Sequence, residues 1–427
     1  MKVTYGVSYK EVLDKKPPNP QKPAKPSFLL QTLIRALSVS DLKATNFKYD
    51  SIGMEKLSKK EPCLILMNHS SFIDLKIVNK IFYPRKYNIV CTGDGFVGRN
   101  WLMKNIGCIP TKKFVSEIDL LRDMLYAVKR YNSSILMYPE ASYSFDGTAT
   151  PLPQSLGRCI KMLNIPVVVI MTKGAFARDP LYNNLQLRQV DVSATVEYLL
   201  SPEEIQAKSP KEINELLAEK FSFDNFRWQK ENGVVIDEDF RADYLNRVLY
   251  KCPNCLAEGK TVGKGTKLIC KNCGKVYELC TDGSMKAENG ETEFSHIPDW
   301  YKWERESVKQ EIIDGNYKLD VEVDIHVMVD TKHLYSVGEG RLTHDREGFR
   351  LTGCGGELEY TQKPLSSYSL YSDYYWYKLG DMICIGNKDV LYYCFPKNCG
   401  DVVAKTRLAT EELYKIVRAE KRNSKTE

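Results

Sequence analysis

The sequence lacks any apolar run long enough to cross a membrane. Its longest apolar stretches, such as residues 165–171, fall far short of the ~20 residues that a spanning helix needs. No secretory signal pattern is present either. We therefore expect no transmembrane helix and a cytoplasmic location. Histidine is scarce, with 5 residues in 427, and His69 alone among them has an aspartate five residues later.

Composition describes a globular chain with one unusual region. Hydrophobic residues make up 43% and charged residues 27%, and 427 residues are too many for one ordinary core, so two or three domains are expected. The net charge of +6 is concentrated in residues 1–60, which hold 12 Lys and Arg against 5 Asp and Glu, a balance of +7. This basic segment predicts peripheral contact with an anionic membrane surface.

The N-terminal segment divides into two parts. Residues 1–26 are rich in Pro and Lys, which predicts an extended arm that does not pack. From Ser27 to Ser38, Leu29, Leu33 and Leu37 recur every four residues, as in an amphipathic helix. Two interpretations stay open for this stripe, namely packing against the protein's own sheet or lying on a membrane surface.

Between residues 46 and 200, apolar strand-like runs alternate with helical ones. Alternation of this kind predicts an α/β domain with a mostly buried sheet flanked by helices, whose sites gather at strand ends. From residue 297 onward, Gly-rich turns separate strands rich in aromatic and β-branched residues, and a final helix follows near residues 406–420. The predicted domains are an arm and helix at 1–45, an α/β domain at 46–245, a small cysteine-containing domain at 246–290 and a β-rich domain at 291–427.

Four cysteines have the spacing of a zinc site. Cys252 and Cys255 form one CxxC turn, and Cys270 and Cys273 form a second one after a short Gly- and Lys-rich segment. Thirteen cysteines without an export signal indicate a reducing compartment, which favours metal ligation over disulfides. Four thiolates leave no open coordination position, so the zinc would be structural. The alternative is two unrelated pairs of buried cysteines.

The strand-like run CLILM ends in Asn68 and His69, and Asp74 follows five residues later. If His69 lies in a loop and Asp74 in the first turn of a helix, the carboxylate can hold Nδ1 of the imidazole and leave Nε2 free as a general base. The alternative is that Ser71 and Asp74 form a capping box at the helix start.

Four blocks, in order, resemble those of the glycerolipid acyltransferases, the 1-acylglycerol-3-phosphate acyltransferase family. NHSSFID at 68–74 resembles the NHxxxxD block, IGCIPTKK at 106–113 the second block, MYPEASYS at 137–144 the FPEGTRS block, and residues 165–168 the fourth. The zinc ribbon and the β-rich domain, which is similar to pleckstrin-homology-like domains, resemble tails of some bacterial members.

The resemblance implies transfer of a fatty acyl group from a thioester of acyl carrier protein or coenzyme A to the hydroxyl of a lysophospholipid, in phospholipid biosynthesis. It implies that His69 is the base and Asp74 its orienting group, and that Lys112 and Lys113 bind the phosphate of the acceptor. The alternative for the two lysines is a solvated pair that follows a strand.

The third block implies that Glu140 and Ser142 contribute to substrate binding, whereas the alternative for Glu140 is a surface carboxylate. Ala141, Ser142 and Tyr143 stand where the family has Gly, Thr and Arg. Because the lost Arg is an expected phosphate ligand, the sequence supports the acyltransferase class better than lysophosphatidate as the acceptor.

Two rival functions stay open. The first is a catalytically silent lipid-binding or scaffold protein with the same fold. The second is a zinc-ribbon nucleic-acid binder, but the ribbon is not flanked by the basic cluster that phosphate binding needs, so no nucleic-acid partner is expected.

Overall fold

The computed structural model describes residues 1–15, 22–112 and 118–424. The chain divides into two compact units. The α/β unit comprises Asn19–Pro180 and Gln186–Trp228, and the β-rich unit comprises Met1–Pro18, Leu181–Leu185 and Gln229–Glu427. The domain boundaries predicted at residues 45, 245 and 290 remain predictions.

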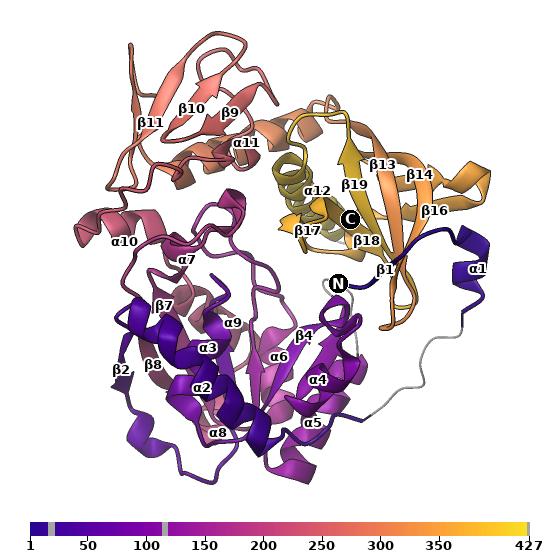
Figure 1. Cartoon of the computed structure of the whole chain (residues 1–427). Helices are drawn as coiled ribbons and strands as arrows, with labels where there is room; N and C mark the ends of the chain where they lie inside the picture. Colours follow the sequence, from indigo (N-terminus) through magenta and orange to yellow (C-terminus); the bar gives the residue numbers. More distant parts are fainter. Residues whose placement is uncertain (16–21, 113–117, 425–427) are drawn as a thin grey trace. The chain divides into compact units, whose positions relative to one another are not determined.

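The α/β unit is built on a sheet with strand order β2-β8-β7-β3-β6-β4-β5 (Figure 1). All neighbouring strands in it run parallel except β7 and β8. The predicted α/β alternation is therefore confirmed. The strands are β2 Lys48–Ile52, β3 Leu64–Met67, β4 Tyr87–Thr92, β5 Cys108–Thr111, β6 Ser134–Met137, β7 Val167–Lys173 and β8 Ser193–Leu200.

The helices of this unit lie on both faces of the sheet. Leu42 of α2 and residues of α3 join one buried cluster, whereas residues of α5, α6, α8 and α9 join the other. These helices are α2 Phe28–Ala44, α3 Asp74–Phe82, α4 Asn100–Asn105, α5 Ile118–Tyr131, α6 Leu156–Leu163, α7 Ala175–Arg178, α8 Pro202–Ala207 and α9 Pro210–Lys220, and α10 Asn225–Glu231 continues into the β-rich unit.

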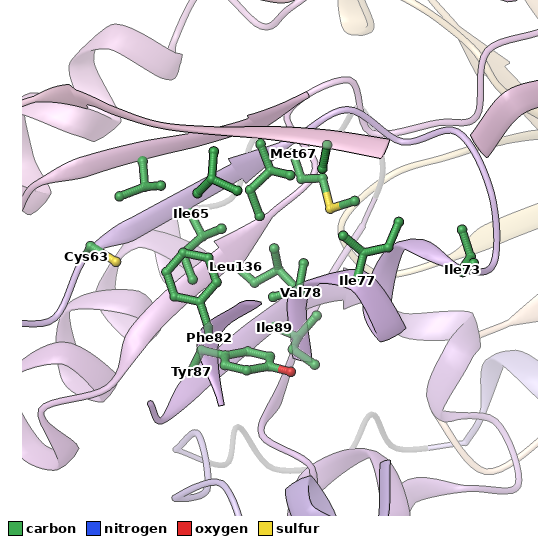
Figure 2. Close-up of a cluster of buried hydrophobic side chains, with 14 of the residues drawn as sticks. Cys63, Ile65, Met67, Ile73, Ile77, Val78, Phe82, Tyr87, Ile89 and Leu136 are labelled. Carbon is green, nitrogen blue, oxygen red and sulfur yellow. The ribbon is translucent and has the colours of Figure 1, made fainter. Parts of the chain in front are cut away.

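Strand β3 lies at the centre of both clusters. Ile65 and Met67 point into the cluster that Figure 2 shows, and Leu64 and Leu66 into the one on the opposite face. All four side chains are fully buried, and each contributes about 1.5–3 kcal/mol by leaving water. Because both faces are covered, polar groups attached to this strand can reach a substrate only beyond its end.

Helix α2 extends the predicted helix to Ala44. It begins after Ser27, whose side chain accepts a hydrogen bond from the backbone N–H of Leu30 at 3.4 Å. Leu29, Leu33 and Leu37 are 79%, 52% and 66% exposed, and the opposite side of the helix carries the buried residues Gln31, Ser38 and Leu42. The interpretation that the leucine stripe packs against the protein's own sheet is therefore wrong.

None of the helices in the described residues combines the length and the apolar character that crossing a bilayer needs.

The β-rich unit begins with a small antiparallel sheet of order β12-β11-β10-β9, followed by helix α11. The strands are β9 Thr261–Lys264, β10 Lys267–Cys270, β11 Val276–Leu279 and β12 Met285–Ala287, and α11 is Ile297–Ile313. Trp300 of α11 is fully buried, with its ring centroid 4.9 Å from that of Tyr277. The small sheet therefore completes its core with a tryptophan from outside it.

A second antiparallel sheet follows, with order β16-β15-β14-β13-β19-β18-β17. The predicted β-rich region with a final helix is confirmed. Its elements are β13 Leu319–Met328, β14 Leu334–Asp345, β15 Gly348–Gly353, β16 Leu358–Gln362, β17 Tyr371–Trp376, β18 Gly380–Gly386, β19 Leu391–Lys397 and the final helix α12 Val403–Asn423.

The N-terminal residues differ from the prediction. Strand β1, Val3–Thr4, pairs in parallel with β14, and helix α1, Tyr9–Leu13, is capped by a capping box of Ser8 and Glu11. Val12 is fully buried. The expectation that residues 1–26 do not pack is therefore wrong for residues 1–15, because these few apolar side chains find partners in the second sheet of the unit. It is also wrong for residues 22–26, where Pro23 and Pro26 are buried.

Candidate active site and metal centre

The loop from Asn68 to Ile73 leaves the end of β3 and enters helix α3. Asn68 is buried and ties the strand end to β7, since its Oδ1 accepts hydrogen bonds from the backbone N–H and Oγ1 of Thr172 at 2.8 and 3.0 Å. Its Nδ2 donates to Ser70 Oγ at 3.0 Å. The side chain of Asn68 thus fixes where His69 leaves the sheet, a role that the sequence analysis did not assign.

His69 and Asp74 meet as the sequence predicted. The Nδ1 atom of His69 lies 3.0 Å from Oδ2 of Asp74, and that carboxylate is 2% exposed whereas the imidazole is 20% exposed. With Nδ1 bound to a buried carboxylate, Nε2 is left as the proton acceptor and the carboxylate stabilises the imidazolium once it forms. The pair has the geometry of a general base with its orienting group.

Asp74 also organises the loop backbone. Its Oδ2 accepts hydrogen bonds from the backbone N–H groups of Ser70 and Ser71 at 3.0 and 3.2 Å. The contact with Ser71 is one half of the capping box that formed the alternative interpretation, but the other half is absent, because Ser71 Oγ accepts from the N–H of Ile73 and not from that of Asp74. The alternative of a capping box is therefore wrong, since the N-cap of α3 is Ile73 and no side chain caps the helix.

Two tyrosines enclose the imidazole. The rings of Tyr138 and Tyr143 stack on His69 with centroid distances of 4.2 and 4.0 Å and interplanar angles of 24° and 28°. Tyr143 also contacts Phe72 at 5.8 Å between centroids. Stacked aromatic faces restrict rotation of the imidazole and favour its cationic form. Burial raises the pKa of Tyr138 well above its ordinary value, so this ring stays neutral.

Glu140 is buried and engages the backbone on both sides of the site. Its Oε2 accepts the N–H of His69 and its Oε1 the N–H of Thr150, both at 2.9 Å. A surface carboxylate is therefore wrong as a description of Glu140. The next residue, Ala141, has a φ of +58°, a conformation that glycine adopts without strain. Ser142 is also buried, at 2% exposure.

Lys112, the first residue of the predicted basic pair, lies at the same edge of the sheet. Lys112 is half-buried and follows β5, whose carboxyl end is separated from that of β3 by β6 and β4. At ~4.8 Å per strand, the backbone of Lys112 lies roughly 14 Å from the carboxyl end of β3. Lys113 lies outside the described residues.

The four predicted zinc ligands come together. The Sγ atoms of Cys252, Cys255, Cys270 and Cys273 all lie within 4.8 Å of one another, with Cys252–Cys273 at 3.8 Å and Cys255–Cys270 at 3.7 Å. Four sulfurs bound at ~2.3 Å to a tetrahedral zinc ion lie about 3.8 Å apart. The donor set therefore fits zinc in both chemistry and size.

Groups around the sulfurs complete the centre. Asn254 of the first CxxC turn donates to Cys273 Sγ at 3.4 Å, and Asn272 of the second turn donates to Cys255 Sγ at 3.5 Å. Hydrogen bonds of this kind orient thiolate ligands and offset their charge. The two asparagines were not predicted as part of the site.

Two of the comparisons with known proteins, with a family model and with solved structures, give matches. Residues 48–173 match a family model described as Acyltransferase. Among solved structures, the chain is similar to the 1-acyl-sn-glycerophosphate (LPA) acyltransferase PlsC from Thermotoga maritima, at 14% identity over 45% of this chain and 76% of that one, with a TM-score of 0.36. No curated protein matches the chain significantly.

Proposed function

From the match of residues 48–173 to the acyltransferase family model, we propose that the chain moves a fatty acyl group from an acyl thioester to the hydroxyl of a lysophospholipid. The donor would be acyl carrier protein or coenzyme A, and the first candidate acceptor is 1-acylglycerol-3-phosphate. The observation that carries the proposal is the 3.0 Å contact between His69 Nδ1 and Asp74 Oδ2 at the carboxyl end of β3.

In the proposed reaction, Nε2 of His69 takes the proton of the acceptor hydroxyl while the hydroxyl oxygen attacks the carbonyl carbon of the thioester. The tetrahedral intermediate collapses, the carbon–sulfur bond breaks, and the thiolate takes the proton back from Nε2. Asp74 stabilises the transient imidazolium, and the stacked rings of Tyr138 and Tyr143 hold it in place. The reaction needs no covalent enzyme intermediate.

Substrate binding is proposed for Lys112, Lys113 and Ser142. The two lysines would hold the phosphate of the acceptor as point charges. Glu140 would act through the backbone, since its two oxygens hold the N–H groups of His69 and Thr150. Because Tyr143 stacks on the base where the resembling family has an arginine, a lysophospholipid with a different head group remains a second candidate acceptor.

The exposed leucine stripe of α2 supports peripheral membrane binding. Leu29, Leu33 and Leu37 form one apolar row, and Lys22 and Lys25 precede the helix. An amphipathic helix with an exposed apolar row and nearby cations suits the interface of an anionic bilayer, where the acceptor resides.

The C-terminal domain, residues 291–427, is proposed to be pleckstrin-homology-like. The support is its strand order, in which the first four strands follow one another, β13 pairs with the last strand β19, and a helix ends the chain. Zinc would stabilise the ribbon without entering the reaction, because four cysteines fill its coordination.

The experiment offers labelled acyl thioesters of acyl carrier protein and of coenzyme A, together with a panel of lysolipids that includes lysophosphatidate. Formation of a diacyl product identifies both donor and acceptor. Lysolipid binding without turnover of any pair would favour the silent lipid-binding or scaffold protein instead. Salt-sensitive nucleic-acid binding that disappears with the ribbon would favour the third function.

A further inference from the structure

A second buried carboxylate, Asp179, contacts the loop that carries His69. Asp179 follows helix α7 and is 3% exposed. The hydroxyl of Ser71 donates a hydrogen bond to its Oδ1, and Arg178 Nη1 lies 3.3 Å from its Oδ2. Asp179 belongs to none of the four sequence blocks, and the proposed reaction does not use it.

Ser71 connects this carboxylate to the one that holds the base. Its backbone N–H donates to Asp74 Oδ2 at 3.2 Å, and its Oγ accepts from the N–H of Ile73 at 3.3 Å while donating to Asp179. One residue between His69 and Asp74 is therefore tied to both carboxylates. A shift of Asp179 would be transmitted to the loop through this serine.

The surroundings of Asp179 have opposing effects on its pKa. Burial raises the pKa of Asp179 to about 6, the Ser71 hydroxyl and Arg178 lower it, and the negative charge of Asp74 raises it further. Arg178 is shared, because its Nη2 lies 3.8 Å from Asp41, which also binds Lys76. At neutral pH, the ionised Asp179 thus adds negative charge next to the pair of His69 and Asp74.

We propose that Asp179 is a positioning residue for the acyl transfer proposed above, an inference that rests on that function. Through Ser71 it fixes the loop between His69 and Asp74, and its charge favours the protonated form of His69. That form arises when the acceptor hydroxyl gives up its proton, so a nearby negative charge strengthens the base.

Two variants separate the effect of the Asp179 charge from the effect of its hydrogen bond to Ser71. Asp179→Asn keeps the size of the side chain and an oxygen for Ser71 but removes the charge, so the titration midpoint of the His69 imidazole should fall by about half to one pH unit. Ser71→Ala removes the connection, so kcat should fall about tenfold. Because the lost hydroxyl also lowers the pKa of Asp179, kcat is compared at about pH 8, where Asp179 stays ionised. Asp191→Asn removes an exposed carboxylate of the same unit and should change neither quantity.

The titration is followed by NMR on the full chain, and the pH profile of kcat is measured in parallel. An unshifted His69 midpoint in Asp179→Asn, or an unchanged kcat in Ser71→Ala, would overturn the inference. The NMR titration does not depend on turnover, so it tests Asp179 even in a protein that transfers no acyl group. Absence of transfer by the wild type would overturn the proposed function instead.

Discussion

Replacing Leu29, Leu33 and Leu37 together by Gln tests the membrane surface of α2. Leu and Gln have similar helix propensities, so the helix should persist. Full burial of a leucine contributes about 1.5–3 kcal/mol, and only the exposed half to four-fifths of each side chain is available to lipid. The three together should therefore contribute roughly 3–6 kcal/mol to membrane binding, and their loss should weaken it at least about 100-fold.

The assay is co-sedimentation with vesicles of anionic and of zwitterionic lipids. The wild type should bind anionic vesicles more tightly, and added salt should reduce that preference. Leu187→Gln is a matched control, because Leu187 is 62% exposed in the same unit but lies outside α2. Equal vesicle binding by the triple variant and the wild type, with equal thermal stability, would refute the reasoning.

The remaining predictions concern the backbone, the metal and pH. Ala141→Gly should raise the free energy of unfolding by roughly 0.5–1 kcal/mol, measured in urea, because the φ of +58° strains alanine; a lower value would contradict this. Metal analysis should find one zinc ion per chain, and Cys273→Ser should reduce this zinc content. Removal of the zinc by a chelator should increase hydrogen exchange in residues 250–285 but not at His69. An unchanged exchange pattern would refute a structural zinc. Because burial raises the pKa of Asp179 to about 6 in the folded state, the wild type loses stability as the pH rises from about 4, the pKa of an unfolded Asp, to about 6. Asp179→Asn avoids this loss and should be about 1–2 kcal/mol more stable than the wild type at pH 7. This difference should shrink as the pH falls through that range and disappear below about pH 3, where the side chain is protonated in both the folded and the unfolded state, and its persistence there would contradict the pKa shift.

Features that depend on residues close together in sequence were predictable. The two CxxC turns supply all four sulfurs of the metal centre, and five residues separate His69 from Asp74. In both cases a short loop brings the groups together, so spacing alone carries most of the geometry.

Features that depend on how distant segments meet were not predictable. Tyr138 and Tyr143 reach His69 because β6 lies beside β3, which the sequence of either strand does not reveal. Asp179 comes from beyond β7, more than a hundred residues from Ser71. The N-terminal arm was wrongly expected to stay unpacked, since β1 pairs with a strand that begins at Leu334.

Helix α2 shows the limit of periodicity. The recurrence of Leu29, Leu33 and Leu37 correctly indicated a helix with one apolar stripe, but it did not show which side faces the sheet. The buried side carries Gln31, Ser38 and Leu42 instead. Tertiary packing decides the buried face, and an exposed stripe is what a lipid-facing helix would retain.

The most direct test of the central claim is the rate of acyl transfer by His69→Ala, compared with the wild type on the donor and acceptor that the substrate panel identifies. The loss of a general base predicts a fall in kcat of about 10²–10⁴-fold with an unchanged fold, monitored by circular dichroism and zinc content. A variant that still transfers acyl groups at the wild-type rate would contradict the assignment of His69 as the base.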